Sequence, residues 1–272
     1  MSATEAEASA TAHSPTRTRK SGDRPRSDAS GQRKVHIVLQ GKGGVGKTLV
    51  ASLIAQFLRE HDRAPVCFDT DPVNSSLVSF AALEAMPVQL LTEDAINVVA
   101  VDEMVERILK ADADVVMDNG ASSFIPLSRY LISDNIAELV EGAGKQVVLH
   151  AILVGSGGAK ETARGLDAIL TQFPASVRVV VWVNEFFGPV SIDGTPIEDT
   201  KFFADNADRL TSIVRLRQQN PLTTGVVLGQ MLERKLTFAE ALSKTDEFFT
   251  VPRQRLTQYR RQVWDQLAAA AL

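Results

Sequence analysis

The sequence contains one cysteine, Cys67, among 272 residues, and only two tryptophans and two tyrosines. A single cysteine excludes a disulfide within the chain and a structural zinc site built on several cysteines. No uncharged apolar run approaches the roughly 18–20 residues that a membrane-spanning helix needs, and the N-terminus lacks the apolar core of a secretory signal. We therefore expect a soluble protein of the cytoplasm. Hydrophobic residues make up 44% of the chain, which is enough for a packed core.

Charge is distributed unevenly along the chain. Residues 1–34 carry seven basic and four acidic side chains, a net charge of +3. The whole chain has a net charge of −4, so the remaining residues carry −7. Ten of the first 33 residues are Ser or Thr and almost none are apolar, so this segment cannot bury enough surface to offset its ordering entropy. We predict a disordered basic tail over residues 1–33 and one folded domain over 34–272. An arm for DNA or anionic lipid is the alternative reading, whereas Glu5 and Glu7 disfavour a transit peptide.

Apolar, β-branched runs alternate with helical patterns from Lys34 onward. Several of these runs are apolar at consecutive positions, as in strands that are covered on both faces. The alternation predicts an α/β fold with a doubly wound, mostly parallel sheet and helices on both faces. The expected strands are 35–39, 65–68, 88–91, 115–117, 146–154, 177–183 and 212–216, and the expected helices are 48–60, 101–111, 136–141, 159–172, 201–208, 238–242 and 252–272.

A phosphate-binding loop is the strongest motif. The pattern G-x-x-x-x-G-K-[ST] follows the first expected strand and precedes an amphipathic helix, which is the context that the motif requires. Glycines let successive backbone N–H groups face an anion, and the helix N-terminus adds a favourable partial charge. Lys47 is expected on the β- and γ-phosphates and the Thr48 hydroxyl on Mg²⁺. The motif consists of Gly41, Lys42, Gly43, Gly44, Val45, Gly46, Lys47 and Thr48.

A second lysine, Lys42, lies inside this loop, five residues before Lys47. The run K-G-G-V-G-K-T resembles the deviant P-loop of the ParA/MinD family of ATPases. That resemblance implies that Lys42 reaches across a dimer interface to the nucleotide of the partner, and that ATP binding and dimerisation are coupled. The alternative is a solvated loop lysine of an ordinary P-loop.

Aspartates follow two of the expected strands. Ligands of doubly wound sheets bind beyond the carboxyl ends of the strands, so Asp69, Asp71 and Asp118 are candidate site residues. Carboxylate and water oxygens suit Mg²⁺ beside phosphates. The resemblance implies that Asp71 orients the attacking water, and that Asp118 contacts Mg²⁺ through water. Asp69 is then a supporting residue, or a turn cap; the expected metal residues are Thr48, Asp71 and Asp118.

The segment after Asp118 departs from the usual ParA pattern, which has a Pro-Pro pair there. The run Asp118–Phe124 and the later P-L-S and Y-L-I-S segments instead resemble the TraL proteins of plasmid conjugation systems. The segments D-T-D-P-V-N, Q-F-P-A and E-R-K-L-T-F are similar to the same group. This resemblance extends from about Lys34 to the C-terminus and leaves out the basic tail.

Other features carry less information. Asn184 follows a strand where this family often contacts adenine, but asparagine is also an ordinary turn residue. The glycine-rich run 155–158 lacks a Lys-Thr pair, so we interpret it as a tight strand-to-helix connection. His36 and His150 lie within apolar strands and are expected to be packed. The last helix, 253–272, shows an apolar stripe that we expect to pack on the sheet; contact of this helix with a membrane is the less favoured alternative.

These features together predict a cytoplasmic ATPase that uses ATP and Mg²⁺, forms a homodimer with ATP, and hydrolyses ATP slowly or when a partner stimulates it. The TraL resemblance implies conjugative plasmid transfer, with type IV secretion or relaxosome components as partners. The alternatives are a partition ATPase that binds DNA non-specifically, a small-molecule phosphotransferase, and a scaffold that binds ATP without turnover.

Overall fold

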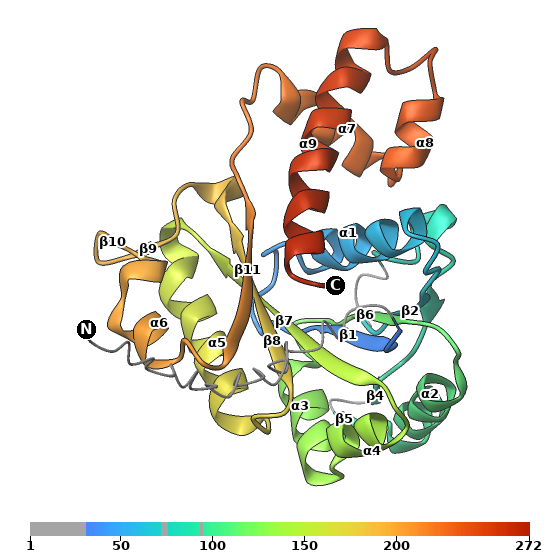
Figure 1. The fold of residues 1–272 in the computed structure, drawn as a ribbon, viewed down its shortest axis with the longest axis vertical. Helices are drawn as coiled ribbons and strands as arrows, with labels where there is room; N and C mark the ends of the chain where they lie inside the picture. The colour runs from blue at the N-terminus through green and yellow to red at the C-terminus, as the bar shows by residue number, and fades with distance from the viewer. Residues whose placement is uncertain (1–30, 72–75, 93–94) are drawn as a thin grey trace, which may run out of the picture. The chain divides into compact units, whose positions relative to one another are not determined.

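A computed structural model describes residues 31–71, 76–92 and 95–272. Its central feature is a seven-stranded sheet in the order β11-β8-β7-β1-β6-β2-β3 (Figure 1), in which every pair of neighbours is parallel. The strands are β1 Lys34–Val38, β2 Val66–Asp69, β3 Met86–Pro87, β6 Val115–Asp118, β7 Gln146–Val154, β8 Arg178–Asn184 and β11 Leu210–Leu216. Two small antiparallel hairpins pair β4 Leu91–Thr92 with β5 Ala95–Ile96 and β9 Ser191–Ile192 with β10 Thr195–Pro196.

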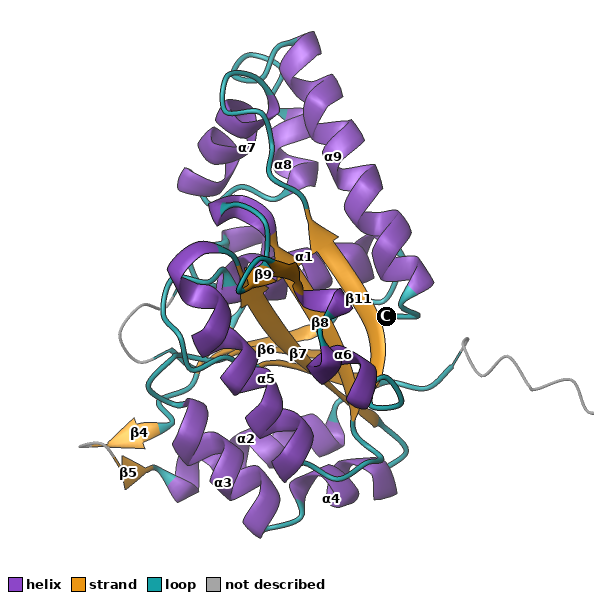
Figure 2. Ribbon diagram, turned by 90° about the vertical axis from the view of Figure 1, so that its left-hand side faces the viewer, coloured by secondary structure: helices purple, strands orange, loops and turns teal. Residues whose placement is uncertain are grey.

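Helices cover both faces of this sheet. The apolar cluster on one face joins it to α1 Lys47–Glu60, α7 Thr224–Glu233, α8 Phe238–Ser243 and α9 Thr250–Ala269. The cluster on the other face joins it to α2 Val98–Lys110, α3 Phe124–Ser133, α4 Ile136–Gly142, α5 Ala159–Gln172 and α6 Lys201–Asp205. Figure 2 shows α9 alongside the edge strand β11, with α5 on the opposite side of the sheet. The predicted doubly wound α/β fold is confirmed.

Strand β8 illustrates why these apolar runs form a sheet that is buried on both faces. Successive side chains of a strand point to opposite faces. Val179, Val181 and Val183 accordingly belong to one apolar cluster, and Val180 and Trp182 belong to the other. All five are fully buried, which explains why apolar residues occupy consecutive positions.

Most predicted elements match the structure within a few residues, but three differences have physical causes. The expected strand over 88–91 is displaced, because the residues that pair with β2 are Met86 and Pro87. Helix α3 was not predicted; it tolerates Pro126 because the backbone N–H groups in the first turn have no partner within the helix. Helix α7 was also not predicted, since its two glycines weaken the helical pattern.

The parallel register brings the carboxyl ends of the central strands to one edge. Asp118, at the end of β6, lies opposite Val38 of β1 and opposite Asp69 of β2. On the other side of β1, Val154 of β7 lies opposite Asn184 of β8. Every candidate residue from the sequence therefore follows or ends a strand at the same edge.

The described residues of the domain form one compact unit over Gln32–Leu272. The prediction of a disordered basic tail falls mainly on residues 1–30, which lie outside the described residues. No helix among those described is both long enough and apolar enough to cross a bilayer. The apolar stripe of α9 packs on the sheet as predicted, with Leu256, Val263 and Leu267 buried.

Candidate functional site

The glycine-rich loop connects β1 to α1 and folds as a phosphate cradle. Gly44 and Gly46 have φ angles of 72° and 100°, a left-handed conformation that glycine adopts without steric cost. The curl turns the loop back on itself, so that the Lys47 ammonium donates to the Lys42 carbonyl oxygen at 3.0 Å. Lys47 is only 8% exposed, and burial lowers its pKa, although Asp118 and Asp71 favour its charged form.

A cavity of about 550 Å³ opens beside this loop. The loop supplies one wall of it, and the segments that follow β2 and β6 supply the other walls. Five of the eight loop residues that sequence reasoning selected therefore face a common space with Asp71, whereas Gly41, Lys42 and Val45 do not line it. Its lining residues are Gly43, Gly44, Gly46, Lys47, Thr48, Asp71, Ser76, Ala121 and Ser122.

Asp118 lies behind this cavity and is 1% exposed. Neither of its carboxylate oxygens has a hydrogen bond of good geometry with the described residues, although the Thr48 hydroxyl lies close enough to act as a donor. Burial raises the pKa of Asp118 to about 7, while the nearby Thr48 hydroxyl and Lys47 ammonium oppose that rise. Buried carboxylates are normally paired or bound to a metal, so the position of Asp118 suits a group that lies beside a cation.

Asp69 and Asp71 have different surroundings although only Thr70 separates them. The Asp69 carboxylate is buried and accepts backbone N–H groups from Asp71, Leu77 and Val78 at 3.1, 2.8 and 3.1 Å. It therefore caps the segment that carries Asp71, as in the turn-cap alternative given from the sequence, and the supporting role of Asp69 at a nucleotide site stays a prediction.

Asp71 is packed tightly against the segment that follows β6. A Cβ atom added at Gly120 would lie 3.0 Å from the Asp71 Cα atom and 3.1 Å from its Cγ atom. Any side chain at position 120 would therefore push Asp71 away, which explains why glycine follows the pair Asp118-Asn119.

The residues at this edge fit a magnesium ion that arrives with a phosphate ligand. No group of three or more His, Cys, Asp or Glu side chains within the described ranges could hold a metal by itself. Mg²⁺ usually takes one or two carboxylates and completes its shell with phosphate and water oxygens. The unsatisfied Asp118 carboxylate, with Thr48 and Asp71 at the cavity, supplies that number of protein donors.

Lys42 does not point into this cavity. Its ammonium forms a 2.5 Å ion pair with Glu161 in the first turn of α5, and its stem passes 3.3 Å from the position that a Cβ atom would take at Gly158. Glu161 was not selected from the sequence, because nothing in the spacing of α5 distinguishes it from other exposed acidic residues.

Asn184 holds the phosphate loop through a hydrogen bond to its backbone. Its amide nitrogen donates to the Val45 carbonyl oxygen at 2.9 Å, and its amide oxygen accepts the Phe186 backbone N–H at 3.1 Å. The amide oxygen thus acts as expected for a turn residue, one of the two interpretations from the sequence. The second amide hydrogen is not used by the Val45 carbonyl, which leaves the other interpretation, an adenine contact, open. The adenine contact remains a prediction.

A second, more apolar cavity of about 750 Å³ adjoins the loop on the side of Asn184. Sequence reasoning missed its other walls, which come from the segments after β8 and β11, from α7 and from Tyr259 of α9. The lining includes Leu49 of α1 and Leu216 of β11, together with Phe186, Phe187, Gln218, Pro221, Val226 and Leu228. An apolar pocket of this size beside a phosphate cradle can hold a flat aromatic base.

The remaining sequence interpretations agree with the structure. His36 and His150 are fully buried, as expected for packed histidines. The glycine-rich run after β7 forms a short 3₁₀ turn, Ser156–Gly158, that leads directly into α5. It is a connection and not a second phosphate loop.

Comparison with known proteins supplies the family. Among solved structures, the "MinC:MinD cell division protein complex, Aquifex aeolicus" is similar at 13% identity and a TM-score of 0.49, over 85% of this chain and 96% of that chain. Two Escherichia coli proteins, each named "Protein TraL", are 40% and 39% identical over 240 residues, which span 88% of this chain and 99% of each relative. The profile of the "CobQ/CobB/MinD/ParA nucleotide binding domain" matches residues 36–245. The family resemblance inferred from the motifs is thereby confirmed: the chain belongs to the CobQ/CobB/MinD/ParA family of nucleotide-binding proteins, and TraL is among its relatives.

Proposed function

We propose that this protein is a Mg²⁺-dependent ATPase that acts as a molecular switch, forming a homodimer with ATP and separating after hydrolysis. The observation that carries the proposal is the buried, unsatisfied Asp118 carboxylate next to Lys47 and Thr48. A buried carboxylate without a partner destabilises the empty protein. Such a cost is retained where a ligand removes it, and here the adjoining cavity has the residues that a nucleotide phosphate requires.

Each side chain of the cavity has a defined task in this proposal. Lys47 and the loop N–H groups hold the β- and γ-phosphates, and Thr48 and Asp118 hold Mg²⁺ directly or through water. When bound, Mg²⁺ neutralises charge that develops on the phosphate oxygens. Asp71 orients a water in line with the γ-phosphate, and Asp69 keeps Asp71 in place through its backbone N–H. The apolar cavity beside Asn184 accommodates the adenine.

Lys42 supplies the coupling to dimerisation. In a single chain it pairs with Glu161, and both side chains are partly exposed, so the pair is weak and exchangeable. ATP in a partner subunit offers three phosphate groups with a higher charge density than one carboxylate. Lys42 then leaves Glu161 and binds across the interface, which makes the dimer dependent on the γ-phosphate.

The biological role is proposed from the TraL relatives. Conjugative plasmid transfer is the process we assign, in the cytoplasm, with type IV secretion or relaxosome components as partners. ATP-driven assembly changes the oligomeric state and modifies no metabolite, which is the expected output of a switch.

DNA binding, as in a partition ATPase, is a second candidate that one observation favours. Between Arg215 and Leu272 the chain has nine basic and five acidic residues, a balance of +4, although the body as a whole is acidic. The C-terminal segment is therefore locally basic, with Arg215 and Arg217 supplying half of this excess and α7 to α9 the rest. Several of these cations are already paired, among them Arg234 with Glu247 and Arg260 with Glu60, so we rank this candidate second.

The first test is the solution mass of the Asp71→Ala variant, measured by light scattering with Mg·ATP and with Mg·ADP. This variant should bind ATP but hydrolyse it slowly, so that the ATP state accumulates. We expect a dimer with ATP, a monomer with ADP, and a monomer in both when Lys42→Ala is added. A mass that ignores the nucleotide despite tight ATP binding would contradict the switch, and would favour a phosphotransferase or an ATP-binding scaffold.

A further inference from the structure

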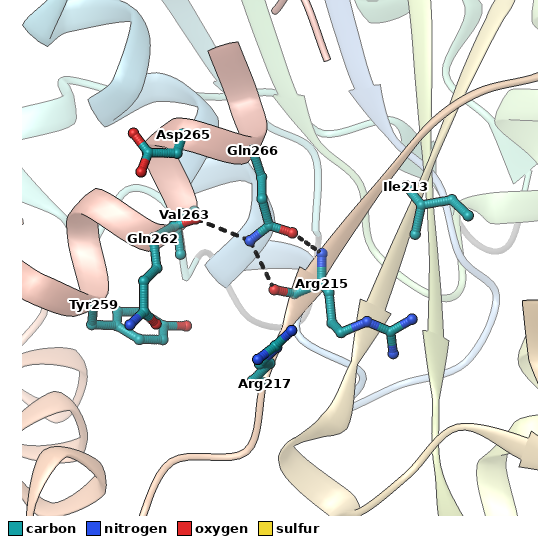
Figure 3. A pocket seen from close by; sticks show the side chains of 8 residues that line it. All are labelled: Ile213, Arg215, Arg217, Tyr259, Gln262, Val263, Asp265 and Gln266. Atoms are coloured by element: carbon teal, nitrogen blue, oxygen red, sulfur yellow. Dashed lines mark hydrogen bonds between the residues drawn. The ribbon is translucent and has the colours of Figure 1, made fainter. Parts of the chain in front are cut away.

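A cleft of about 530 Å³ lies between the edge strand β11 and the helix α9, apart from the phosphate cavity. Figure 3 shows that Arg215 and Arg217 line it from the strand side, and that Tyr259, Gln262 and Gln266 line it from the helix. None of these residues takes part in the phosphate and magnesium chemistry described above. The cleft therefore needs an explanation of its own.

Side chains already occupy the backbone hydrogen-bonding groups of β11 that a further strand would need at this point. The Gln266 side-chain oxygen accepts the Arg215 backbone N–H at 2.7 Å, and its nitrogen donates to the Arg215 carbonyl oxygen at 3.1 Å (Figure 3). The Gln219 amide donates to the Arg217 carbonyl oxygen at 2.9 Å. Edge strands protected in this way do not recruit a partner strand, so a ligand of the cleft must use side chains.

The two arginines of the cleft differ in their pairing. Arg215 is neutralised by Glu185, at 2.5 Å, and by Glu198. The guanidinium of Arg217 has neither a hydrogen bond nor an ion pair with any of the described residues, although Arg217 lines the cleft. Asp265, the acidic residue in the lining, faces Arg261 of its own helix at 4.0 Å. Arg217 is exposed to solvent, and it is the arginine of the cleft lining that has no protein partner among the described residues.

Tyr259 provides a second donor. It is 5% exposed and its ring packs against Phe238 at a centroid distance of 6.2 Å. Its hydroxyl makes no hydrogen bond within the part of the chain that the structure describes, and it is not among the buried polar atoms. The ring is therefore buried while the hydroxyl stays accessible from the cleft that Tyr259 lines. Burial raises the pKa of Tyr259 to about 12, so the hydroxyl keeps its proton and can donate to an anion.

We propose that the cleft between β11 and α9 is a second binding site, which takes an oxyanion between the Arg217 guanidinium and the Tyr259 hydroxyl. A planar guanidinium binds carboxylate or phosphate through paired hydrogen bonds. The Gln262 side chain, exposed on the same wall, supplies a further amide donor. The ligand class is therefore a small molecule that carries a carboxylate or a phosphate group.

The location of the site implies communication with the nucleotide. Arg217 and Tyr259 line both this cleft and the apolar cavity beside the phosphate loop. An oxyanion that orders these two side chains would change one wall of that cavity. Oxyanion binding itself does not depend on the proposed ATPase, so either claim can fail without the other.

The test is an NMR titration of the ¹⁵N-labelled full chain with inorganic phosphate and, separately, with acetate. Mg·ADP at saturation occupies the phosphate loop, and resonances of 41–48 report any binding there. Wild-type resonances of Arg217 and Gln262 should shift saturably with at least one probe. Arg217→Ala should weaken that binding roughly tenfold or more, and Tyr259→Phe severalfold, since each removes a hydrogen bond to a charged group.

Arg255→Ala is the matched control, because it removes a guanidinium from the helix that carries Tyr259, forms no ion pair with the described residues and lies outside the cleft lining. It should leave the affinity unchanged. Saturation by acetate alone identifies a carboxylate ligand, and saturation by phosphate alone identifies a phosphate ligand. The proposal is overturned if neither probe saturates, if shifts are confined to the phosphate loop, or if Arg217→Ala binds as tightly as the wild type.

Discussion

Two groups of buried polar side chains lie on neighbouring strands of the sheet, and they differ in how many of their polar atoms have a partner. On β6, neither carboxylate oxygen of Asp118 has a hydrogen-bond partner among the described residues. On β1, β7 and β8, His36, His150 and Trp182 form a chain of hydrogen bonds. The sheet buries both groups almost completely, so burial alone does not distinguish a binding site from a structural core.

The histidine chain has one consistent arrangement of protons. The Trp182 indole N–H donates to His150 Nδ1 at 3.0 Å, so His150 carries its proton on Nε2 and donates it to His36 Nδ1, also 3.0 Å away. Burial, and then the charges of Lys34, Arg63 and Arg178, lower the pKa of His36 to about 3. Both rings are neutral, so His36 carries its own proton on Nε2, which has no hydrogen-bond partner among the described residues.

The difference shows what marks a ligand site in a buried strand. The histidine chain leaves one ring nitrogen, His36 Nε2, without a partner among the described residues, and none of its residues lines the cavity at the phosphate loop. Asp118 instead lies beside Lys47 and Thr48, which do line that cavity. An unsatisfied buried charge costs stability, and a ligand that arrives with Mg²⁺ and phosphate can remove this cost. Perturbed groups of this kind cluster at functional sites.

The largest effect should come from Asp118→Asn. The amide keeps the shape and removes the buried charge, so in the absence of nucleotide and metal the variant should be more stable at pH 8, by up to about 4 kcal/mol from the raised pKa. Urea unfolding measures the change. Mg²⁺-dependent ATP binding should weaken in the same variant. Equal or lower stability of Asp118→Asn would show that the carboxylate is satisfied in the free protein.

The next largest effect should come from His150→Phe. It leaves the Trp182 N–H and the His36 ring without their partners, and each orphaned buried group costs about 1–3 kcal/mol. We expect a loss of about 2–3 kcal/mol in the free energy of unfolding and unchanged ATP affinity. His61→Phe, at the exposed end of α1, is the control and should change stability by about 0.5 kcal/mol or less. A loss of ATP affinity in folded His150→Phe protein would contradict the separation of the two groups.

The pH dependence of stability should have opposite signs for the two groups. Asp118 binds its proton more tightly in the folded state. The stability that it adds to the fold is therefore present below pH 3.8 and is lost as the pH rises through about 7. His36 binds its proton less tightly in the folded state, so the stability that it adds is present above pH 6.5 and is lost as the pH falls towards about 3.

Between pH 4 and 6.5 these two trends oppose each other in the wild type. Asp118→Asn removes the contribution that falls with pH. The stability of this variant should therefore rise with pH more steeply than that of the wild type, by up to about 1.4 kcal/mol per pH unit for one group. Unfolding midpoints without nucleotide and in the presence of a chelator measure both slopes. Parallel profiles of the wild type and the variant would contradict the assignment of Asp118 as the carboxyl with a raised pKa.

Most of the fold could be predicted from the sequence because its signals are local. The fully apolar runs of β7 and β8 and the helix α5 follow from periodicity, and the structure gives 146–154 and 159–172 as expected. Helix α7 could not be predicted because its helical conformation depends on packing: Val227 and Met231 are buried against the apolar cluster of α9, and tertiary contacts override weak propensity.

The motifs of the site could be predicted from the sequence, but the contacts between its distant residues could not. Spacing places Lys47, Thr48 and Asp71 at one edge, since strand ends meet there. It cannot show that Asn184 supports the Val45 carbonyl, or that Tyr259 of the last helix lines the apolar cavity. Those contacts join residues more than a hundred positions apart in the sequence, and only the packed fold determines them.

The smallest effect, and the one that extends the comparison to an exposed pair, should come from Glu161→Gln. Lys42 and Glu161 are both partly exposed, so breaking the pair should change stability by about 1 kcal/mol or less. It should nevertheless free Lys42 for the partner nucleotide, and in the Asp71→Ala background the dimer should form at a severalfold lower protein concentration with ATP.

Asp193→Asn is the matched control, because it breaks the exposed Lys160–Asp193 pair next to Glu161 and leaves Lys42 untouched. If both variants shift the dimerisation midpoint equally, surface charge and not release of Lys42 controls assembly; if only Glu161→Gln shifts it, the intrachain pair competes with the dimer.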